Sequence, residues 1–199
     1  MSYVQGQGQE VVSGTVPEVR VMVATGEEMR DFGRRLAGVL RGGDLLVLSG
    51  GLGAGKTTMT QGLGAGLGVR GAVTSPTFVI ARVHPSLVGG PALVHVDAYR
   101  LGTTNDVAGE VDDLDLDASL EESVTVVEWG EGKVEDLTED RLTVVIERTE
   151  GTTVPAADGL PAGAEGDVDA AVGDDPRVVT VRASGARWAA VDLAGALAP

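Results

Sequence analysis

Short runs of apolar residues, separated by glycine-rich or charged segments, form the main pattern along the chain. Runs of this kind predict strands that are buried within a sheet. We expect such strands at residues 19–23, 45–48, 78–83, 92–96, 124–127, 142–146, 178–181 and 188–191. The last two runs are separated by a short segment that contains Ser184 and Gly185, a pattern that predicts a closing β-hairpin.

Two segments have helical spacing instead. From Met29 onward, apolar residues recur at intervals of three and four, and Thr25 and Glu28 form a capping-box pattern in front of them. This pattern predicts an amphipathic helix that ends at the glycine pair of residues 42–43. After the glycine-rich turn, Met59, Leu63 and Leu67 form a single apolar stripe, which predicts a second helix.

Composition divides the chain into a core and less ordered parts. Residues 1–17 lack apolar periodicity and predict a flexible N-terminal tail. Residues 150–176 are rich in Ala, Gly, Asp and Pro and contain no Lys or Arg, which predicts a disordered acidic insertion. The predicted core is residues 18–149, and residues 177–199 form the closing hairpin and C-terminal tail. Residues 105–122, with eight acidic and no basic side chains, are expected to form a loop with a short helix.

Length and charge narrow the class of protein. A chain of 199 residues suits one globular domain with tails. The net charge of −15 argues against a large direct contact with nucleic acid or an anionic membrane, because both need clustered Lys and Arg.

Cysteine is absent, which excludes disulfides, thiolate zinc sites and a cysteine nucleophile. The longest stretch without a charged residue has 14 residues (83–96), whereas a membrane-spanning helix needs about 20. We therefore expect a soluble, cytoplasmic protein.

The strongest chemical signal is at residues 50–57, which read Gly-Gly-Leu-Gly-Ala-Gly-Lys-Thr and fit the P-loop pattern G-x-x-x-x-G-K-[ST]. Glycines let backbone N–H groups curl around phosphates, and the following helix points its N-terminus at the anion. Lys56 is expected to reach the β- and γ-phosphates, and the Thr57 hydroxyl is expected to bind Mg²⁺. This composition would produce about 0.005 such matches by accident, so the motif indicates a nucleotide site.

Two carboxylates are candidates to act beside this loop. Asp97 and Glu128 each come directly after an apolar run that predicts a strand. Strands aligned beside the P-loop strand would bring both carboxylates near the γ-phosphate. One could then bind Mg²⁺ while the other orients or activates the attacking water, and the spacing alone leaves both assignments open.

Several further residues have less certain roles. A hydroxyl of the Ser75-Pro76-Thr77 segment could sense the γ-phosphate, or the segment could be a plain turn. Arg100 and, as a weaker candidate, Arg82 could supply transition-state charge or form surface ion pairs. His95 is interpreted as a packed strand histidine, whereas Trp129 either covers the nucleotide or fills the core. Because the lysines lie outside any N-K-x-D signature, ATP is favoured over GTP as the nucleotide.

In this order and spacing, the motifs resemble the TsaE family. They read Leu-Gly-Ala-Gly-Lys-Thr-Thr at residues 52–58, Ser-Pro-Thr-Phe at 75–78, His-Val-Asp-Ala-Tyr-Arg at 95–100 and Glu-Trp at 128–129. The resemblance covers residues 19–148 and resumes in the predicted closing hairpin. It implies an α/β fold of the P-loop NTPase type, with a mixed central β-sheet flanked by helices.

The resemblance also implies a function. Members of this family are Mg²⁺-dependent ATPases required for the threonylcarbamoyladenosine modification of tRNA, and they support turnover of the TsaB–TsaD heterodimer. On this basis Lys56, Asp97 and Glu128 are predicted to be catalytic, and Thr57 and Glu128 to hold Mg²⁺. The residues predicted to contact ATP are Gly53, Ala54, Gly55, Lys56, Thr57, Thr58, Thr77 and Asp97. A small-molecule P-loop kinase and a nucleotide-dependent switch without hydrolysis are the alternatives.

Overall fold

A computed structural model describes residues 18–76, 80–100, 121–149 and 175–199 of the chain. The predicted N-terminal tail (1–17), most of the acidic segment (105–122) and most of the predicted insertion (150–176) lie outside the described residues. Thr77 lies outside them as well, as does the side chain of Arg100.

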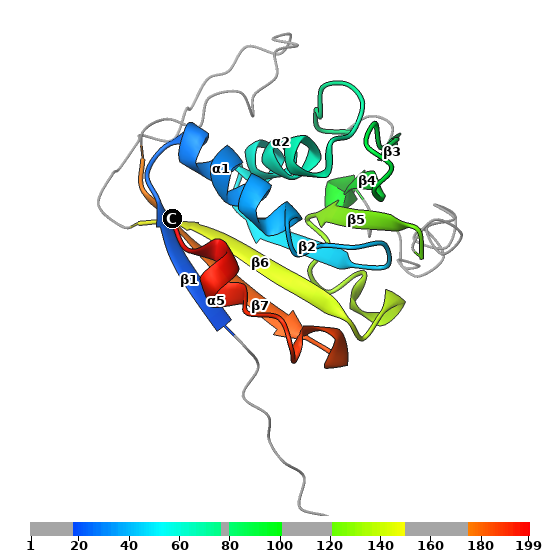
Figure 1. The fold of residues 1–199 in the computed structure, drawn as a ribbon. Coiled ribbons are helices and arrows are strands. Elements are labelled where there is room, and N and C mark those ends of the chain that lie inside the picture. Colours follow the sequence, from blue (N-terminus) through cyan, green and yellow to red (C-terminus); the bar gives the residue numbers. More distant parts are fainter. Residues whose placement is uncertain (1–17, 77–79, 101–120, 150–174) are drawn as a thin grey trace, which may run out of the picture.

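The described part of the chain forms a seven-stranded mixed sheet with the order β1-β7-β6-β2-β5-β4-β3 (Figure 1). Strands β6, β2, β5 and β4 are parallel to one another. On one side β7 pairs antiparallel with β6 and β1 pairs antiparallel with β7, and on the other side β3 pairs antiparallel with β4. The strands are β1 (Glu18–Val23), β2 (Leu45–Gly50), β3 (Ala81–His84), β4 (Ala92–Asp97), β5 (Ser123–Glu128), β6 (Arg141–Arg148) and β7 (Arg177–Ser184). The expected mixed central sheet is confirmed.

Helices cover the two faces of the sheet unequally. Helices α1 (Gly26–Ala37), α2 (Lys56–Leu67) and α5 (Leu193–Leu197) pack on one face and form the larger apolar core with it. On the other face, a smaller apolar cluster includes Leu137 of the 3₁₀ helix η2 (Glu135–Leu137). Alternate residues of the central strands enter these two cores, as expected of strands buried on both faces. None of the helices in the described ranges has both the length and the apolar character that crossing a membrane requires.

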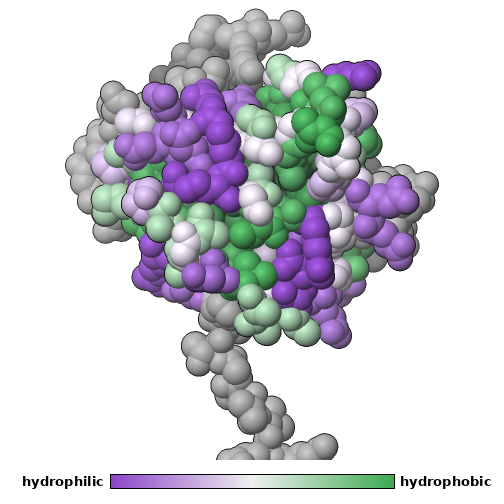
Figure 2. Space-filling model, in the orientation of Figure 1, coloured by the Kyte–Doolittle hydropathy of each residue, from purple (hydrophilic) through white to green (hydrophobic). Residues whose placement is uncertain are grey.

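Helix α1 begins as the capping pattern predicts. The backbone N–H of Glu28 donates to Thr25 Oγ1 at 3.1 Å. The Glu28 carboxylate in turn accepts the N–H of Ala24 at 2.7 Å, one residue before the position expected for a capping box. The buried side of α1 includes Met29 and Phe32, whereas the outward side of this helix is hydrophilic (Figure 2). Residues 38–40, which the sequence pattern places in the helix, lie beyond its end at Ala37.

Two glycines allow α1 and α2 to approach closely. A Cβ on Gly62 would lie 2.1 Å from the backbone oxygen of Arg30, and one on Gly33 would lie 2.3 Å from that of Met59. Both contacts are shorter than any side chain tolerates, so the backbones touch only because these positions lack a Cβ. The glycines lower the helix propensity of α2, and tight packing against α1 compensates for this loss.

The predicted closing hairpin is wrong. Strand β7 runs to Ser184 and pairs with both β1 and β6, but residues 188–191 form no strand. The chain turns at Gly185, where φ is +91°, and Trp188 then lies in the 3₁₀ helix η3 (Ala186–Trp188). The indole of Trp188 is 1% exposed and belongs to the larger core. The final residues form α5, so they are part of the packed domain rather than a tail.

Strand β3 also begins later than expected. It starts at Ala81, because Ile80 has a positive φ of 66° and leaves the extended conformation. The residues 78 and 79 lie outside the described ranges. The carbonyl of Ile80 accepts the backbone N–H of Asp97 at 2.8 Å, so this bend is fixed against the end of β4. A further 3₁₀ helix, η1 (Ala98–Arg100), follows β4 directly.

A buried ion pair fastens the C-terminal region to the turn between α1 and β2. One terminal nitrogen of Arg187 donates to Asp44 Oδ2 at 3.2 Å and to the Val39 carbonyl at 2.7 Å. The same Asp44 oxygen accepts the backbone N–H of Arg41 at 2.9 Å. Burial nevertheless raises the pKa of Asp44 above its usual value of 3.8, because these donors only partly replace the lost water.

Replacing Gly62 by Ala tests the close helix approach. Helix propensity alone would make Gly62→Ala stabilising by about 1 kcal/mol. Because the added Cβ meets the α1 backbone, we expect instead a loss of about 1–3 kcal/mol in the free energy of unfolding, measured in urea. Ala65→Gly, at an exposed position of the same helix, is the matched control and should cost about 1 kcal/mol through propensity. A more stable Gly62→Ala protein would contradict the packing described here.

The raised pKa of Asp44 predicts a pH dependence of stability. The folded protein holds the proton of the Asp44 carboxyl group more tightly than the unfolded chain does. The stabilisation that this proton gives is therefore fully present below pH 3.8 and is lost as pH rises through the raised pKa. Relative to Asp44→Asn, which does not titrate, the wild type should therefore be more stable at about pH 4 than at about pH 7. Urea unfolding of both proteins at each pH measures this difference. If the stability of the wild type relative to Asp44→Asn increased with pH, the pKa of Asp44 would be lowered by folding instead of raised.

Candidate nucleotide site

The glycine-rich loop lies at the carboxyl end of the central strand β2. It joins β2 to α2, and β5 and β6 pair with β2 on its two sides. Gly53 and Gly55 have φ of +68° and +110°, conformations that favour glycine, and a Cβ on Gly51 would meet no atom within 4 Å. Open space therefore lies beside the loop at Gly51, and the loop leads into the N-terminus of α2, where anions bind favourably.

Lys56 lies inside the loop. Its ammonium group donates to the carbonyls of Gly50 and Gly51 at 3.0 and 3.1 Å. It also sits 3.6 Å from the centre of the Trp129 ring, a cation–π distance, and the residue is 4% exposed. Two carbonyl dipoles and an aromatic face thus help to hold the lysine charge at the mouth of the loop.

Trp129 is held in an unusual backbone conformation. Its φ is +60°, which costs about 1–3 kcal/mol for a residue of this size, and its N–H donates to the Leu48 carbonyl of the P-loop strand at 3.0 Å. The ring meets Tyr99 edge-on, with centroids 5.3 Å apart. This conformation places the indole over Lys56, so Trp129 covers the loop and does not fill the apolar core.

Thr57 and Glu128 are in direct contact. The Thr57 hydroxyl lies 2.9 Å from Glu128 Oε1 and 3.1 Å from Oε2, and both side chains are buried. Oε1 also lies 2.7 Å from His95 Nε2. A hydroxyl oxygen and a carboxylate, facing each other beside a phosphate-binding loop, are the protein ligands that Mg²⁺ takes in nucleotide sites.

Asp97 stands next to Glu128 at the edge of the sheet. The two residues are register partners on the parallel strands β4 and β5. Asp97 Oδ2 accepts the Ser75 hydroxyl at 3.1 Å, and Oδ1 accepts the backbone N–H of Tyr99 at 3.0 Å. The serine of the predicted Ser-Pro-Thr segment is therefore connected to the carboxylate.

A cavity of about 560 Å³ opens beside the loop, within the size range of small-molecule sites. In addition to the loop and the aromatic pair, its wall contains a polar contact between Ser49 Oγ and Glu131 Oε2 at 2.7 Å. Its lining residues are Ser49, Gly50, Gly51, Tyr99, Trp129, Glu131 and Lys133.

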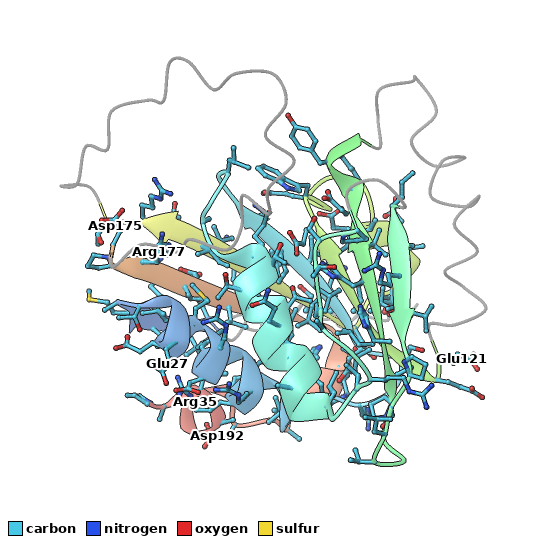
Figure 3. The ribbon with its side chains drawn as sticks, turned by 90° about the horizontal axis from the view of Figure 1, so that it is seen from above. Glu27, Arg35, Glu121, Asp175, Arg177 and Asp192 are labelled. Carbon is cyan, nitrogen blue, oxygen red and sulfur yellow. The ribbon has the colours of Figure 1, made fainter. Side chains whose placement is uncertain are left out.

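Two arginines contact the loop from the side of β6 and β7. Terminal nitrogens of Arg148 and Arg177 donate to the Gly53 carbonyl at 3.3 and 3.4 Å. The two residues are direct partners in the β6–β7 ladder, and Figure 3 shows Arg177 at the start of β7, near Asp175. Burial lowers the pKa of Arg177, and the neighbouring charge of Arg148 adds to this effect. These guanidinium groups thus fix the backbone of the loop at its turn.

A sequence profile of the family described as "Threonylcarbamoyl adenosine biosynthesis protein TsaE" matches residues 23–154. The chain belongs to the TsaE family. A Streptomyces coelicolor protein named tRNA threonylcarbamoyladenosine biosynthesis protein TsaE is 61% identical over 83% of this chain and 97% of its own length. The Bacillus subtilis protein of the same name is 34% identical over 81% of this chain and 84% of its own length.

A solved structure supports the same assignment. The crystal structure of Bacillus subtilis YdiB matches 88% of this chain and 92% of its own length, with a TM-score of 0.60 and 28% identity. The P-loop NTPase-like fold and the TsaE resemblance expected from the sequence are therefore confirmed.

In this TsaE-family chain, the structure brings Lys56, Thr57, Glu128 and Asp97 to one edge of the sheet. Ala54 and Thr58 are buried in the loop and first helical turn. Arg82 instead donates to Thr74 Oγ1 at 3.0 Å, at the exposed edge of the sheet. The roles of these residues toward a nucleotide stay predictions.

Sequence reasoning missed Arg148, Arg177 and Glu131. The two arginines lie 95 and 124 residues from Gly53, so only the pairing of β6 with β7 brings them to the loop. Glu131 follows the Glu-Trp motif closely, and this position is the one signal that could have drawn attention to it.

The contact between Thr57 and Glu128 predicts a measurable effect on stability. Thr57→Val preserves the side-chain shape but removes one donor from a buried carboxylate, so the free energy of unfolding should fall by about 1–3 kcal/mol. Thr57→Ser keeps the hydroxyl and serves as the control. Urea unfolding without nucleotide measures both, and equal stability of the two variants would contradict the contact.

Proposed function

We propose that this chain is a Mg²⁺-dependent ATPase that acts in the threonylcarbamoyladenosine modification of tRNA. The observation that carries the proposal is the P-loop lysine beside a Thr57–Glu128 contact, in a chain of the TsaE family. The printed names of the relatives support the pathway, and the loop supports nucleotide chemistry.

The phosphates would bind beside the glycine-rich loop, at the N-terminus of α2. There the loop N–H groups would surround them, and Lys56 would exchange its contacts with the loop carbonyls and Trp129 for contacts with the β- and γ-phosphate oxygens. A charge-assisted contact of this kind is stronger than a neutral hydrogen bond, so the exchange favours the bound state.

The donor set near the loop fits Mg²⁺. Within the described ranges no three His, Asp or Glu side chains are grouped so that they could hold a metal ion by themselves. Thr57 and Glu128 would therefore hold Mg²⁺ together with phosphate oxygens and water, as Mg²⁺ prefers. When bound, the ion would neutralise charge on the phosphates during hydrolysis.

Asp97 is the candidate to orient the attacking water. Its carboxylate lies beside Glu128 in register and accepts hydrogen bonds from the Ser75 hydroxyl and the Tyr99 N–H. A carboxylate in this position would accept a proton from water or hold it in line with the γ-phosphate.

The proposed partners are TsaB and TsaD, as the family resemblance implies. A net charge of −15 favours docking on proteins over direct binding of tRNA, because tRNA would repel this surface. The tRNA would then be held by the partner proteins, and this chain would couple ATP hydrolysis to their turnover.

ATP hydrolysis by the purified chain and by three variants tests the enzymatic part. Lys56→Ala should weaken ATP binding by about 10- to 100-fold and remove hydrolysis. Asp97→Asn should lower kcat by about 10²- to 10⁴-fold while ATP still binds. Glu128→Gln should bind Mg²⁺ more weakly and so lose most of its hydrolysis at ordinary Mg²⁺ concentrations. Arg34→Ala, which removes a cation from the exposed side of α1, should retain wild-type activity. Undiminished turnover by Lys56→Ala would refute the P-loop mechanism.

The same variants separate the alternatives in the presence of partners. The wild-type chain should copurify with TsaB and TsaD and support modification of tRNA in an ATP-dependent assay. If Asp97→Asn and Glu128→Gln support modification without hydrolysis, the chain is a nucleotide switch. If mass spectrometry instead detects a phosphorylated metabolite, it is a kinase.

A further inference from the structure

His95 is fully buried in β4, and it contacts the carboxylate that faces the P-loop helix. Its Nε2 lies 2.7 Å from Glu128 Oε1. Thr57 contacts the same oxygen at 2.9 Å from the opposite element, α2. His95 is thus the second side chain that holds Glu128 and the one that comes from the neighbouring strand.

The contacts of the ring assign its proton. Within the described residues, Nδ1 of His95 has no hydrogen-bond partner, whereas Nε2 faces a carboxylate oxygen. A proton on Nδ1 alone would bury an unsatisfied donor and would turn the Nε2 lone pair toward Glu128, which is repulsive. Nε2 therefore carries the hydrogen and donates it to Oε1.

A packing role does not account for a histidine at this position. Residues alternate along β4, and Leu93, two positions earlier on the same face, belongs to the larger apolar core. An apolar side chain would fill the place of His95 without leaving a buried nitrogen unsatisfied. The other histidine, His84, is also buried, but its Nδ1 lies 3.4 Å from the Arg70 carbonyl and no carboxylate contact is described for it.

The two contacts make the oxygens of Glu128 unequal. Oε1 accepts from both His95 and Thr57, whereas the one contact of Oε2 among the described residues is that of Thr57, at 3.1 Å. A carboxylate held in this way cannot rotate freely, and the oxygen with fewer donors keeps more of its capacity to bind a cation.

We propose that His95 is a positioning residue that holds Glu128 Oε1 through Nε2–H and so presents Oε2 to the Mg²⁺ bound with ATP. This inference rests on the proposed function and assigns His95 no contact with the nucleotide. Partners that orient a metal-binding side chain typically change metal affinity by about 10- to 100-fold when they are removed.

Three substitutions distinguish the two ring nitrogens. Gln places an amide N–H the same number of bonds from Cα as Nε2, whereas Asn places it at the distance of Nδ1. His95→Gln should therefore retain much of the wild-type metal affinity, and His95→Asn and His95→Leu should lose it. His84→Leu removes the other buried histidine and is the matched control, with metal affinity expected to be unchanged.

The measurement is a titration with Mn²⁺, followed by electron paramagnetic resonance, of each protein saturated with a non-hydrolysable ATP analogue. We expect a 10- to 100-fold weaker Mn²⁺ affinity for His95→Leu and His95→Asn. Calorimetric binding of the analogue in EDTA should stay within about 2-fold of wild type for every variant, because His95 acts through the metal ligand. A structural defect would weaken both measurements together.

The outcomes separate this inference from the function on which it rests. Equal Mn²⁺ affinity of the wild type and His95→Leu would overturn the positioning role alone. If His95→Leu does not fold, the comparison of His95→Gln with His95→Asn decides, and equal affinities of these two would overturn the role of Nε2. A wild-type protein that binds the analogue but no Mn²⁺ would overturn the proposed Mg²⁺-dependent function and this inference together.

Discussion

The carboxylate of Glu128 is the constraint on which the site depends. Removing a charged group from water costs several kcal/mol, and the side chain is buried where β2, β4 and β5 meet α2. It is tolerated because Thr57 and His95 reach it from two different elements. The parallel order of the central strands and the close packing of α2 are therefore needed both to stabilise this charge and to face it with the phosphate-binding loop.

Local patterns allowed much of the fold and site to be predicted. The loop around Lys56 is recognisable because its chemistry depends on consecutive residues, and Asp97 and Glu128 could be proposed because each ends an apolar run. Their proximity required parallel neighbouring strands, a property of the whole sheet. The contact of His95 with Glu128 likewise depends on the register between β4 and β5, so residue 95 could only be interpreted as a strand residue.

Two predictions about strands were wrong, and neither could have been corrected from the local sequence pattern. Residues 188–191 have a strand-like composition, but the Trp188 side chain is buried in the core. The N–H of Arg187 donates to Asp140 Oδ1 at 3.0 Å, so this part of the chain bonds to a side chain instead of to a neighbouring strand. The late start of β3 follows from the backbone of Ile80, whose positive φ no side-chain pattern announces. In the first case the deciding contact joins segments that are distant in the sequence, Arg187 and Asp140.

The ladder between β6 and β7 has one further consequence. Its last described pair is Arg148 with Arg177, and the Thr149 N–H then donates to the Pro176 carbonyl at 3.1 Å, so the chain leaves the sheet and returns to it at a single closed point. Closing a loop between fixed ends costs only about 0.6 kcal/mol more for each doubling of its length. A change in the number of residues between Thr149 and Pro176 would therefore leave both ends of that segment in place, beside the arginines that contact the P-loop.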